Sequence, residues 1–249
     1  MEISLFSLLT FHLRELSRYP RYLWRCLFQP SVISIAGLRV GVGPETTAAT
    51  RKLLYSERYE RGERRCVSLA LEQGDVVLEV GAGIGFLSAL CARQIGSARV
   101  HAYEANPELM GVIRRTHRLN EVEPTVVCAA LGEQDGRARF YVSPEFFSSS
   151  SEPEGVDHVR SIEVEVRDVN EVMSRLRPTF LIIDIEGGER ELVPLIEWAS
   201  VRKLAIELHP KQLGEDGVRD IVGQLARAGF RQHRLLSSRR KRFISRRVP

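Results

Sequence analysis

The sequence predicts a Rossmann-like, doubly wound α/β fold, in which helices cover both faces of a mostly parallel sheet. Short apolar runs alternate with helical segments over most of the chain, and this alternation is typical of parallel sheets built from β-α-β units. The first buried strand, expected at residues 76–80, leads into glycines at every second position, Gly81, Gly83 and Gly85. Such a turn lets the backbone approach a ligand closely.

The composition is that of one globular domain. The chain has 249 residues, of which 43% are hydrophobic, enough for one sizeable core. Its four cysteines are widely separated and form no CxxC pair, which argues against a zinc site or a disulfide framework and favours a reducing compartment. No stretch approaches the ~18 uncharged apolar residues of a membrane span. We therefore expect a cytoplasmic protein.

The net charge of +4 is unevenly distributed. Residues 231–249 contain eight Arg and Lys residues and no acid, which leaves −4 for the rest of the chain. The basic tail, residues 238–249, could contact phosphates or anionic lipid. A solvated terminus is the alternative that we favour, because no aromatic platform accompanies the charges. The acidic remainder makes nucleic acid an unlikely partner and disfavours an RNA-modifying enzyme.

Residues 1–45 form a predicted N-terminal extension. Apolar residues recur at helical spacing between residues 5 and 16, and residues 14–28 mix arginines with aromatic side chains. This pattern suits peripheral contact of residues 1–30 with a membrane, and equally a helix packed on the main domain or on a second subunit. A short strand is expected at residues 32–40. A cleaved signal peptide is not expected, since Glu2 replaces the usual basic start.

The main domain is expected at residues 46–237, opening with a helix at residues 46–71 that ends before Gly74. Asn106 and Pro107 suit the first turn of a later helix. The other elements follow from apolar periodicity: strands at residues 100–104, 125–129, 138–142, 162–166, 179–185, 203–208 and 231–237, and helices at residues 86–95, 189–198 and 218–228.

A polar loop at residues 143–155 separates two of the expected strands and contains Phe146 and Phe147. The paired phenylalanines favour a substrate lid, with a tolerated insertion as the alternative.

The glycine turn and Glu104 together predict a nucleoside cofactor. Glu104 follows the next strand, where a carboxylate can accept both ribose hydroxyls. The dinucleotide fingerprint has its third glycine five residues after the first, and that position here is Phe86. An NAD(P)-dependent oxidoreductase is therefore the weaker alternative. The apolar run from Ala129 to Leu131 could border an adenine, with ordinary strand-end packing as the alternative. Tyr59 and Glu60 could reach the cofactor, although a solvated helix face is the interpretation that we favour.

The pattern Glu-x-Gly-x-Gly-x-Gly resembles motif I of class I S-adenosylmethionine-dependent methyltransferases. In that resemblance the glycine loop lies along the methionine and ribose, and Glu79 lies near the amino-acid moiety. We expect the cofactor site to comprise Glu79, Gly81, Ala82, Gly83, Gly85, Glu104, Ala105, Ala130 and Leu131.

Asp184-Ile-Glu186-Gly-Gly-Glu189, together with Val166-Arg-Asp and Ile206-Glu-Leu-His209, resembles the FkbM family of methyltransferases over about residues 55–230. The resemblance implies S-adenosylmethionine as methyl donor, a sheet of seven strands, and a hydroxyl acceptor on a sugar, a glycolipid or a polyketide-type natural product. It does not cover the N-terminal extension or the basic tail.

Asp184, Glu186 and His209 are the predicted catalytic residues. The class I resemblance places the strands ending at Glu79, Asp184 and Glu207 side by side. In an extended backbone, Asp184 and Glu186 would point the same way, and two such carboxylates share a proton or hold a divalent cation. No further ligand set has a recognisable spacing, so no metal is expected. His209 titrates near neutral pH and is the most defensible general base.

Each of the three also has a structural interpretation, as a capping or bracing side chain. The sequence thus predicts an S-adenosylmethionine-dependent O-methyltransferase that acts on a small-molecule, glycan or lipid-linked acceptor. A nucleoside-binding or scaffold protein without catalysis is the alternative from another class.

Overall fold

The computed structural model describes residues 18–44, 46–142, 160–233, 237 and 241–246. Its centre is a seven-stranded sheet in the order β11-β12-β10-β9-β3-β4-β5. The strands are β3 (Val77–Val80), β4 (Val100–Tyr103), β5 (Thr125–Val127), β9 (Phe180–Ile183), β10 (Lys203–Glu207), β11 (Arg231–Gln232) and β12 (Lys241–Ser245). Only β12 runs against its neighbours, β10 and β11. The predicted Rossmann-like, mostly parallel sheet is confirmed.

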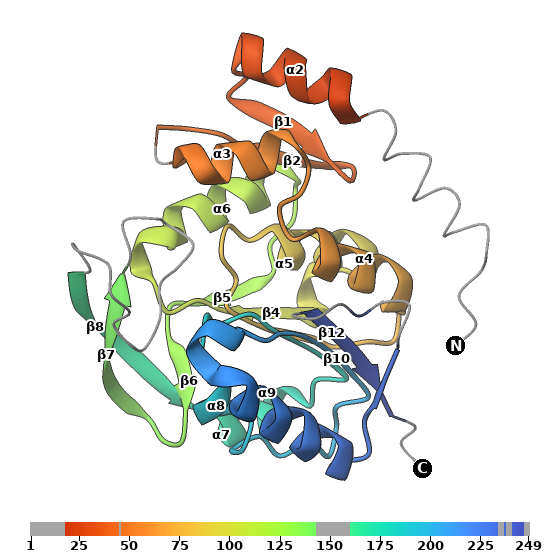
Figure 1. The fold of residues 1–249 in the computed structure, drawn as a ribbon, viewed down its shortest axis with the longest axis vertical. Helices are drawn as coiled ribbons and strands as arrows, with labels where there is room; N and C mark the ends of the chain where they lie inside the picture. The colour runs from red at the N-terminus through yellow and green to blue at the C-terminus, as the bar shows by residue number, and fades with distance from the viewer. Residues whose placement is uncertain (1–17, 45, 143–159, 234–236, 238–240, 247–249) are drawn as a thin grey trace.

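Helices cover both faces of this sheet (Figure 1). One face carries α4 (Arg61–Ala70), α5 (Phe86–Ile95) and α6 (Met110–Leu119), and the other carries α7 (Val169–Leu176), α8 (Glu189–Leu192) and α9 (Pro210–Arg227). Two 3₁₀ turns, η1 (Ser97–Arg99) and η2 (Pro107–Leu109), precede β4 and α6.

The central strands are buried on both faces. Phe180 and Ile182 of β9 belong to the apolar cluster beneath α4 and α5, whereas Leu181 and Ile183 belong to the cluster beneath α7, α8 and α9. Alternate side chains of a strand point to opposite faces. Two covered faces therefore explain why these strands are uninterrupted apolar runs in the sequence.

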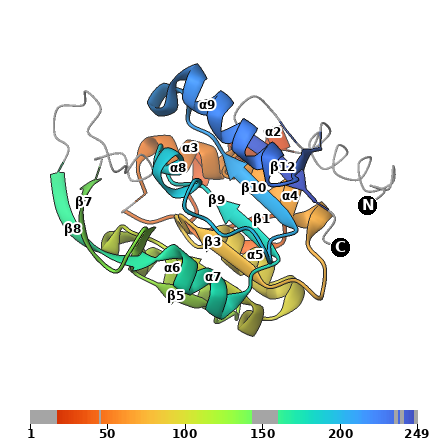
Figure 2. The same cartoon turned by 90° about the horizontal axis from the view of Figure 1, so that it is seen from below.

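A smaller sheet of three strands lies beside the main one. It contains β6 (Ala130–Gly132), β7 (Gly136–Val142) and β8 (Arg160–Asp168) in the order β6-β8-β7, with β7 antiparallel to β8. Figures 1 and 2 show β7 and β8 on the side of the molecule opposite β12. The predicted lid, residues 143–155, lies outside the described residues.

The N-terminal region differs in detail from the sequence prediction. It contains α2 (Arg18–Phe28), β1 (Val32–Ile35), β2 (Leu38–Gly41) and α3 (Ala48–Tyr55). The single strand expected at residues 32–40 is a hairpin, which turns at Ala36 and Gly37 with φ values of 51° and 82°. The helical stripe expected at residues 5–16 lies outside the described part of the chain.

The helix expected at residues 46–71 is split into α3 and α4. Glu57 and Glu60, with φ values of 56° and 44°, adopt left-handed conformations between the two helices. No glycine or proline marks this break, so the sequence offers no local signal for it. The helix expected at residues 189–198 is also shorter, since α8 ends at Leu192.

The basic tail expected at residues 238–249 is partly a strand of the main sheet. β12 lies between β11 and β10, with Phe243 fully buried and Ile244 5% exposed on opposite faces. The expected domain boundary at residue 238 therefore falls inside the fold, because two apolar residues among the cations suffice to fill both faces. None of the helices in the described ranges has the length and apolar character needed to cross a membrane.

Candidate active site

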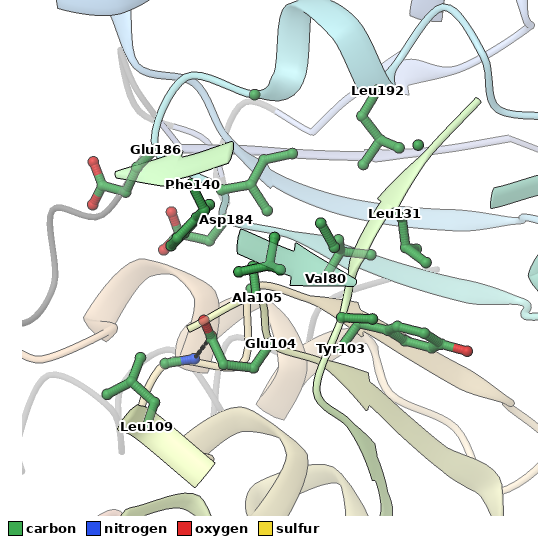
Figure 3. Close-up of a pocket in the computed structure, with 18 of the residues that line it drawn as sticks. Val80, Tyr103, Glu104, Ala105, Leu109, Leu131, Phe140, Asp184, Glu186 and Leu192 are labelled. Atoms are coloured by element: carbon green, nitrogen blue, oxygen red, sulfur yellow. Dashed lines mark hydrogen bonds between the residues drawn. The ribbon is translucent and has the colours of Figure 1, made fainter. Parts of the chain in front are cut away.

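A cavity of about 810 Å³ opens at the carboxyl ends of the central strands (Figure 3). β3 pairs with β4 on one side and with β9 on the other. The strands that follow β3 in the chain extend the sheet in one direction, and those that follow β9 extend it in the other. Open α/β sheets bind ligands at such a reversal of strand order. The volume lies within the range of about 300–1,000 Å³ typical of small-molecule sites.

Glu104 is fixed at the wall of this cavity by two backbone amides. The N–H of Gly83 donates to its Oε2 at 2.9 Å, and the N–H of Asn106 donates to its Oε1 at 2.8 Å. Burial raises the pKa of Glu104, and these N–H groups oppose that rise because they favour the carboxylate. A rigid acceptor therefore stands where the sequence predicts the ribose site.

The three glycines of the loop after β3 are required for different reasons. A Cβ at Gly81 (φ +88°) would lie 1.8 Å from the carbonyl oxygen of Asp184. One at Gly83 would lie 2.9 Å from the Tyr59 hydroxyl, and one at Gly85 would lie 2.9 Å from Nε2 of His117. Gly81 and Gly83 line the cavity. Gly85 instead allows α5 and α6 to pack closely.

Glu79 and Ala82, also predicted to bind the cofactor, lie away from the cavity wall. Glu79 is 1% exposed within β3 and hydrogen-bonds to Ser88, whose Oγ lies 3.0 Å from Nε2 of His117. Burial raises the pKa of Glu79 well above its usual range. Ala82 is fully buried against α6. Both residues support the glycine loop from beneath.

The other predicted cofactor residues, Ala105, Ala130 and Leu131, line the cavity. They belong to a mostly apolar wall that includes Phe140 of β7 and Val164 of β8, and Figure 3 shows Leu131 and Phe140. No local sequence pattern predicted β7 and β8 at the site, because strands of a second sheet are placed by tertiary pairing.

The predicted catalytic residues come together at the opposite side of the cavity. Nε2 of His209 lies 3.6 Å from Oδ1 of Asp184 and 3.4 Å from Oε2 of Glu186. Asp184 and Glu186 line the cavity (Figure 3), whereas His209, 9% exposed, is not part of its lining. Glu186 has a left-handed φ of 47° instead of the extended backbone we expected. The two carboxylates nevertheless both approach His209.

Glu189 is a functional candidate that the sequence analysis missed. Its Oε1 lies 2.6 Å from Nδ1 of His209, and its side chain is completely buried. Burial alone would lower the pKa of His209, but the hydrogen bond to Glu189 and the charges of Glu186 and Asp184 raise it to about 9. A pKa of about 9 favours the imidazolium at neutral pH. The general base that we expected at His209 would need the neutral imidazole.

The carboxyl group of Asp184 binds a proton more tightly than an ordinary aspartate does. Burial raises its pKa well above the usual range, and the charges of Glu207 and Glu63 add to the effect. The charge of His209 opposes it. Asp184 and His209 thus influence proton binding at each other.

Glu207, at the end of β10, completes a set of potential metal ligands. Asp184, Glu207 and His209 each offer a ligand atom, and these atoms lie within 4.8 Å of one another. The class I resemblance predicted that the strands ending at Asp184 and Glu207 lie side by side, and β9 and β10 are indeed paired. A cation can be bound by all three only when His209 is neutral. The pKa of about 9 disfavours this form at neutral pH.

Carboxylates dominate the charged lining of the cavity. Tyr59 and Glu60, expected on a solvated face, instead border it. Among the described residues that line it, only Arg58 and Arg139 carry positive charge. The acidic members are Glu60, Glu104, Glu133, Asp184, Glu186, Glu191 and Glu207. Such a lining favours a cationic ligand over a pyrophosphate.

Fold and site together define a Rossmann-like protein with a cavity of small-molecule size at the carboxyl edge of its sheet. Residues 79–232 match the methyltransferase FkbM domain. The chain belongs to the FkbM methyltransferase family, as the sequence motifs indicated.

Solved structures of other methyltransferases resemble the chain at low identity. Ribosomal protein L11 methylase from Lactobacillus delbrueckii subsp. bulgaricus aligns at 14% identity and a TM-score of 0.46, covering 77% of this chain and 80% of that one. A methyltransferase from Pyrococcus furiosus aligns at 14% identity and a TM-score of 0.45, covering 91% and 95%. Comparison with curated proteins gives no match.

Proposed function

We propose that this methyltransferase uses S-adenosylmethionine to methylate a hydroxyl group. The observation that carries the proposal is Glu104, which the amides of Gly83 and Asn106 hold at the cavity wall. A carboxylate at the end of this strand is suited to a ribose diol. Membership of the FkbM family supports the methyl-transfer chemistry.

The residues present fit this cofactor. Glu104 would receive the ribose hydroxyls, and the apolar wall at Ala130 and Leu131 would border the adenine. Glu60, Asp184 and Glu186 give the remaining wall a negative charge, which suits a ligand that carries a sulfonium and an ammonium group. The same charge disfavours the pyrophosphate of NAD(P). When bound, S-adenosylmethionine supplies a methyl group already activated for transfer.

The protein's task is then to align the acceptor hydroxyl and remove its proton. Alignment alone contributes ~7–11 kcal/mol in favourable cases. We expect Asp184 to accept the proton, because a raised pKa makes its carboxylate a stronger base. His209 is a positioning residue in this scheme. Held by Glu189 at 2.6 Å, its imidazolium fixes the charge next to Asp184 and Glu186.

The acceptor class follows from the cavity lining and the family. Sugars, glycolipids and polyketide-type natural products present neutral hydroxyl groups, which the carboxylates do not repel. Phosphorylated or strongly acidic acceptors would be disfavoured by the same carboxylates. We therefore expect a neutral region of the acceptor to enter the cavity.

Calorimetric titration tests the cofactor assignment without knowledge of the acceptor. S-adenosylhomocysteine should bind the unchanged protein, and Glu104→Ala should weaken that binding by at least about tenfold, since a charge-assisted hydrogen bond contributes ~1.5–3 kcal/mol. Glu163→Ala is the matched control, because Glu163 is 69% exposed on β8 and does not line the cavity. Binding of NADH in place of S-adenosylhomocysteine would overturn the proposal.

A further inference from the structure

α2 presents an apolar face to solvent. Among the described residues, six large apolar side chains are exposed, and five of them lie on this one helix. They are Tyr19 (70% exposed), Leu23 (49%), Trp24 (53%), Leu27 (76%) and Phe28 (63%). Exposed apolar surface gathered in one place marks an interaction site, whereas single exposed residues are ordinary.

The orientation of α2 is fixed by the buried side chain of Arg25. Its Nη1 donates to the carbonyl oxygen of Tyr55 at 2.9 Å and lies 3.1 Å from Oε1 of Glu57. Its Nη2 donates to the carbonyl oxygen of Ser34 at 2.8 Å. Tyr22 packs against the core on the same side. The face of α2 that points away from the body is therefore determined by the fold.

The helix that packs beside α2 reaches the cavity. The sixth exposed side chain is Leu53 of α3, 43% exposed, and α3 packs beside α2 (Figure 1). Leu53 also lines the cavity, as does Arg58. The α2–α3 surface, defined by the five residues of α2 and Leu53, thus borders the entrance to the candidate active site.

Positive charge accompanies the α2–α3 surface. Between residues 18 and 58 the sequence has seven Arg and Lys residues and two acids, Glu45 and Glu57. Glu57 is buried and paired with Arg25, whereas Lys52 and Arg58 are exposed and Arg21 is about half exposed. Aromatic side chains with flanking cations are typical of helices that lie in the interface of an anionic bilayer.

We propose that the α2–α3 surface binds a membrane that contains anionic lipid. α2 would lie in the plane of the interface, with Leu23, Leu27 and Phe28 at the acyl boundary and the cations at the headgroups. Two copies packed through this surface would bring the same cations together, which disfavours a dimer. If the protein methylates a hydroxyl group as proposed above, a lipid-linked acceptor would enter the cavity beside Leu53; this part of the inference rests on the proposed function.

Flotation with lipid vesicles tests the proposal on the full-length protein. The unchanged protein should float with phosphatidylcholine vesicles that contain ~30% phosphatidylglycerol and should bind pure phosphatidylcholine about tenfold less well. The variant Leu23→Ser/Leu27→Ser/Phe28→Ser should lose flotation. The control Lys211→Glu/Arg227→Glu changes two exposed cations of α9, across the sheet, and should still float.

Two further measurements distinguish the other outcomes. Sedimentation measures the oligomeric state of both proteins. If the unchanged protein is dimeric and does not float, and the triple variant is monomeric, the surface binds a second copy and the membrane proposal is overturned. A melting temperature lowered by several degrees in the triple variant without vesicles would show that part of the chain covers this surface, and would also overturn it. Titration with S-adenosylhomocysteine separates the two proposals, since its binding without flotation would refute membrane binding alone.

Discussion

Gly81 and Asp184 are in backbone contact at the centre of the site, since a Cβ at Gly81 would lie 1.8 Å from the carbonyl oxygen of Asp184. The N–H of Asp184 also donates to the carbonyl oxygen of Val80 at 2.9 Å. These contacts join the glycine loop after β3 to the end of β9. The cofactor loop and the proposed base are therefore positioned by one another.

Gly81→Ala should destabilise the protein by about 3 kcal/mol or more, because the clash is with backbone and the φ of +88° is unfavourable for alanine. Affinity for S-adenosylhomocysteine should fall with it. Gly37→Ala is the control, with a similar φ of +82° and open space at the Cβ position, and should cost only ~1–2 kcal/mol. Urea unfolding measures both. Equal losses in the two variants would refute the contact argument.

Asp184→Asn should reduce turnover by ~100-fold or more, since general-base catalysis typically contributes that much. Affinity for S-adenosylhomocysteine should change little, because Glu104 still holds the ribose. The assay is transfer of a labelled methyl group to an identified acceptor. Glu191→Gln, which also alters a carboxylate that lines the cavity, should keep most of its turnover. Full turnover in Asp184→Asn would remove Asp184 from the proton-accepting role.

His209 should make stability depend on pH on the alkaline side. Its pKa of about 9 exceeds the value of ~6.5 expected in the unfolded chain. The folded state therefore holds the proton more tightly, which contributes up to about 3 kcal/mol below pH ~6.5 and is lost as the pH rises through about 9. Urea unfolding at pH 6.5 and 9.5 should show this loss in the unchanged protein. A loss of the same size in His209→Gln would contradict the assignment.

His117 should make the protein less stable as the pH falls, whereas His209 makes it less stable as the pH rises. Burial lowers its pKa to about 4, against ~6.5 in the unfolded chain. The unfolded state thus binds the proton first, and up to about 3 kcal/mol of stability, present above pH ~6.5, is lost as the pH falls to about 4. Thermal unfolding across this window should show the loss in the unchanged protein. His117→Gln should unfold with a flatter acid limb, and identical profiles would rule this explanation out.

The sequence predicted the site best where chemistry lies at strand ends. Gly81, Glu104, Asp184 and His209 each follow a buried strand, and parallel strands bring their carboxyl ends to one edge of a sheet. The expected strand order was therefore enough to predict that these residues lie close together. The pairing of Glu189 with His209 had no such signal, because it joins the start of α8 to a turn 20 residues away.

What the sequence could not supply depends on tertiary contacts. The break at Glu57 and Glu60 adopts left-handed backbone without glycine, and the fold around Arg25 and Arg64 holds it, since both side chains donate hydrogen bonds or form ion pairs there. β12 lies in a basic segment that does not have the apolar pattern of a buried strand. Among its described side chains, only Phe243 and Ile244 are buried, one on each face of the sheet. The β7 and β8 wall arises from a second sheet.

A structure of the protein with S-adenosylhomocysteine would show where the nucleoside binds. We expect both ribose hydroxyls to donate to Glu104, with the adenine beside Ala130 and Leu131 and the thioether sulfur toward Asp184. Electron density for the nucleoside elsewhere, or a Glu104 carboxylate turned away from the ribose, would contradict this expectation.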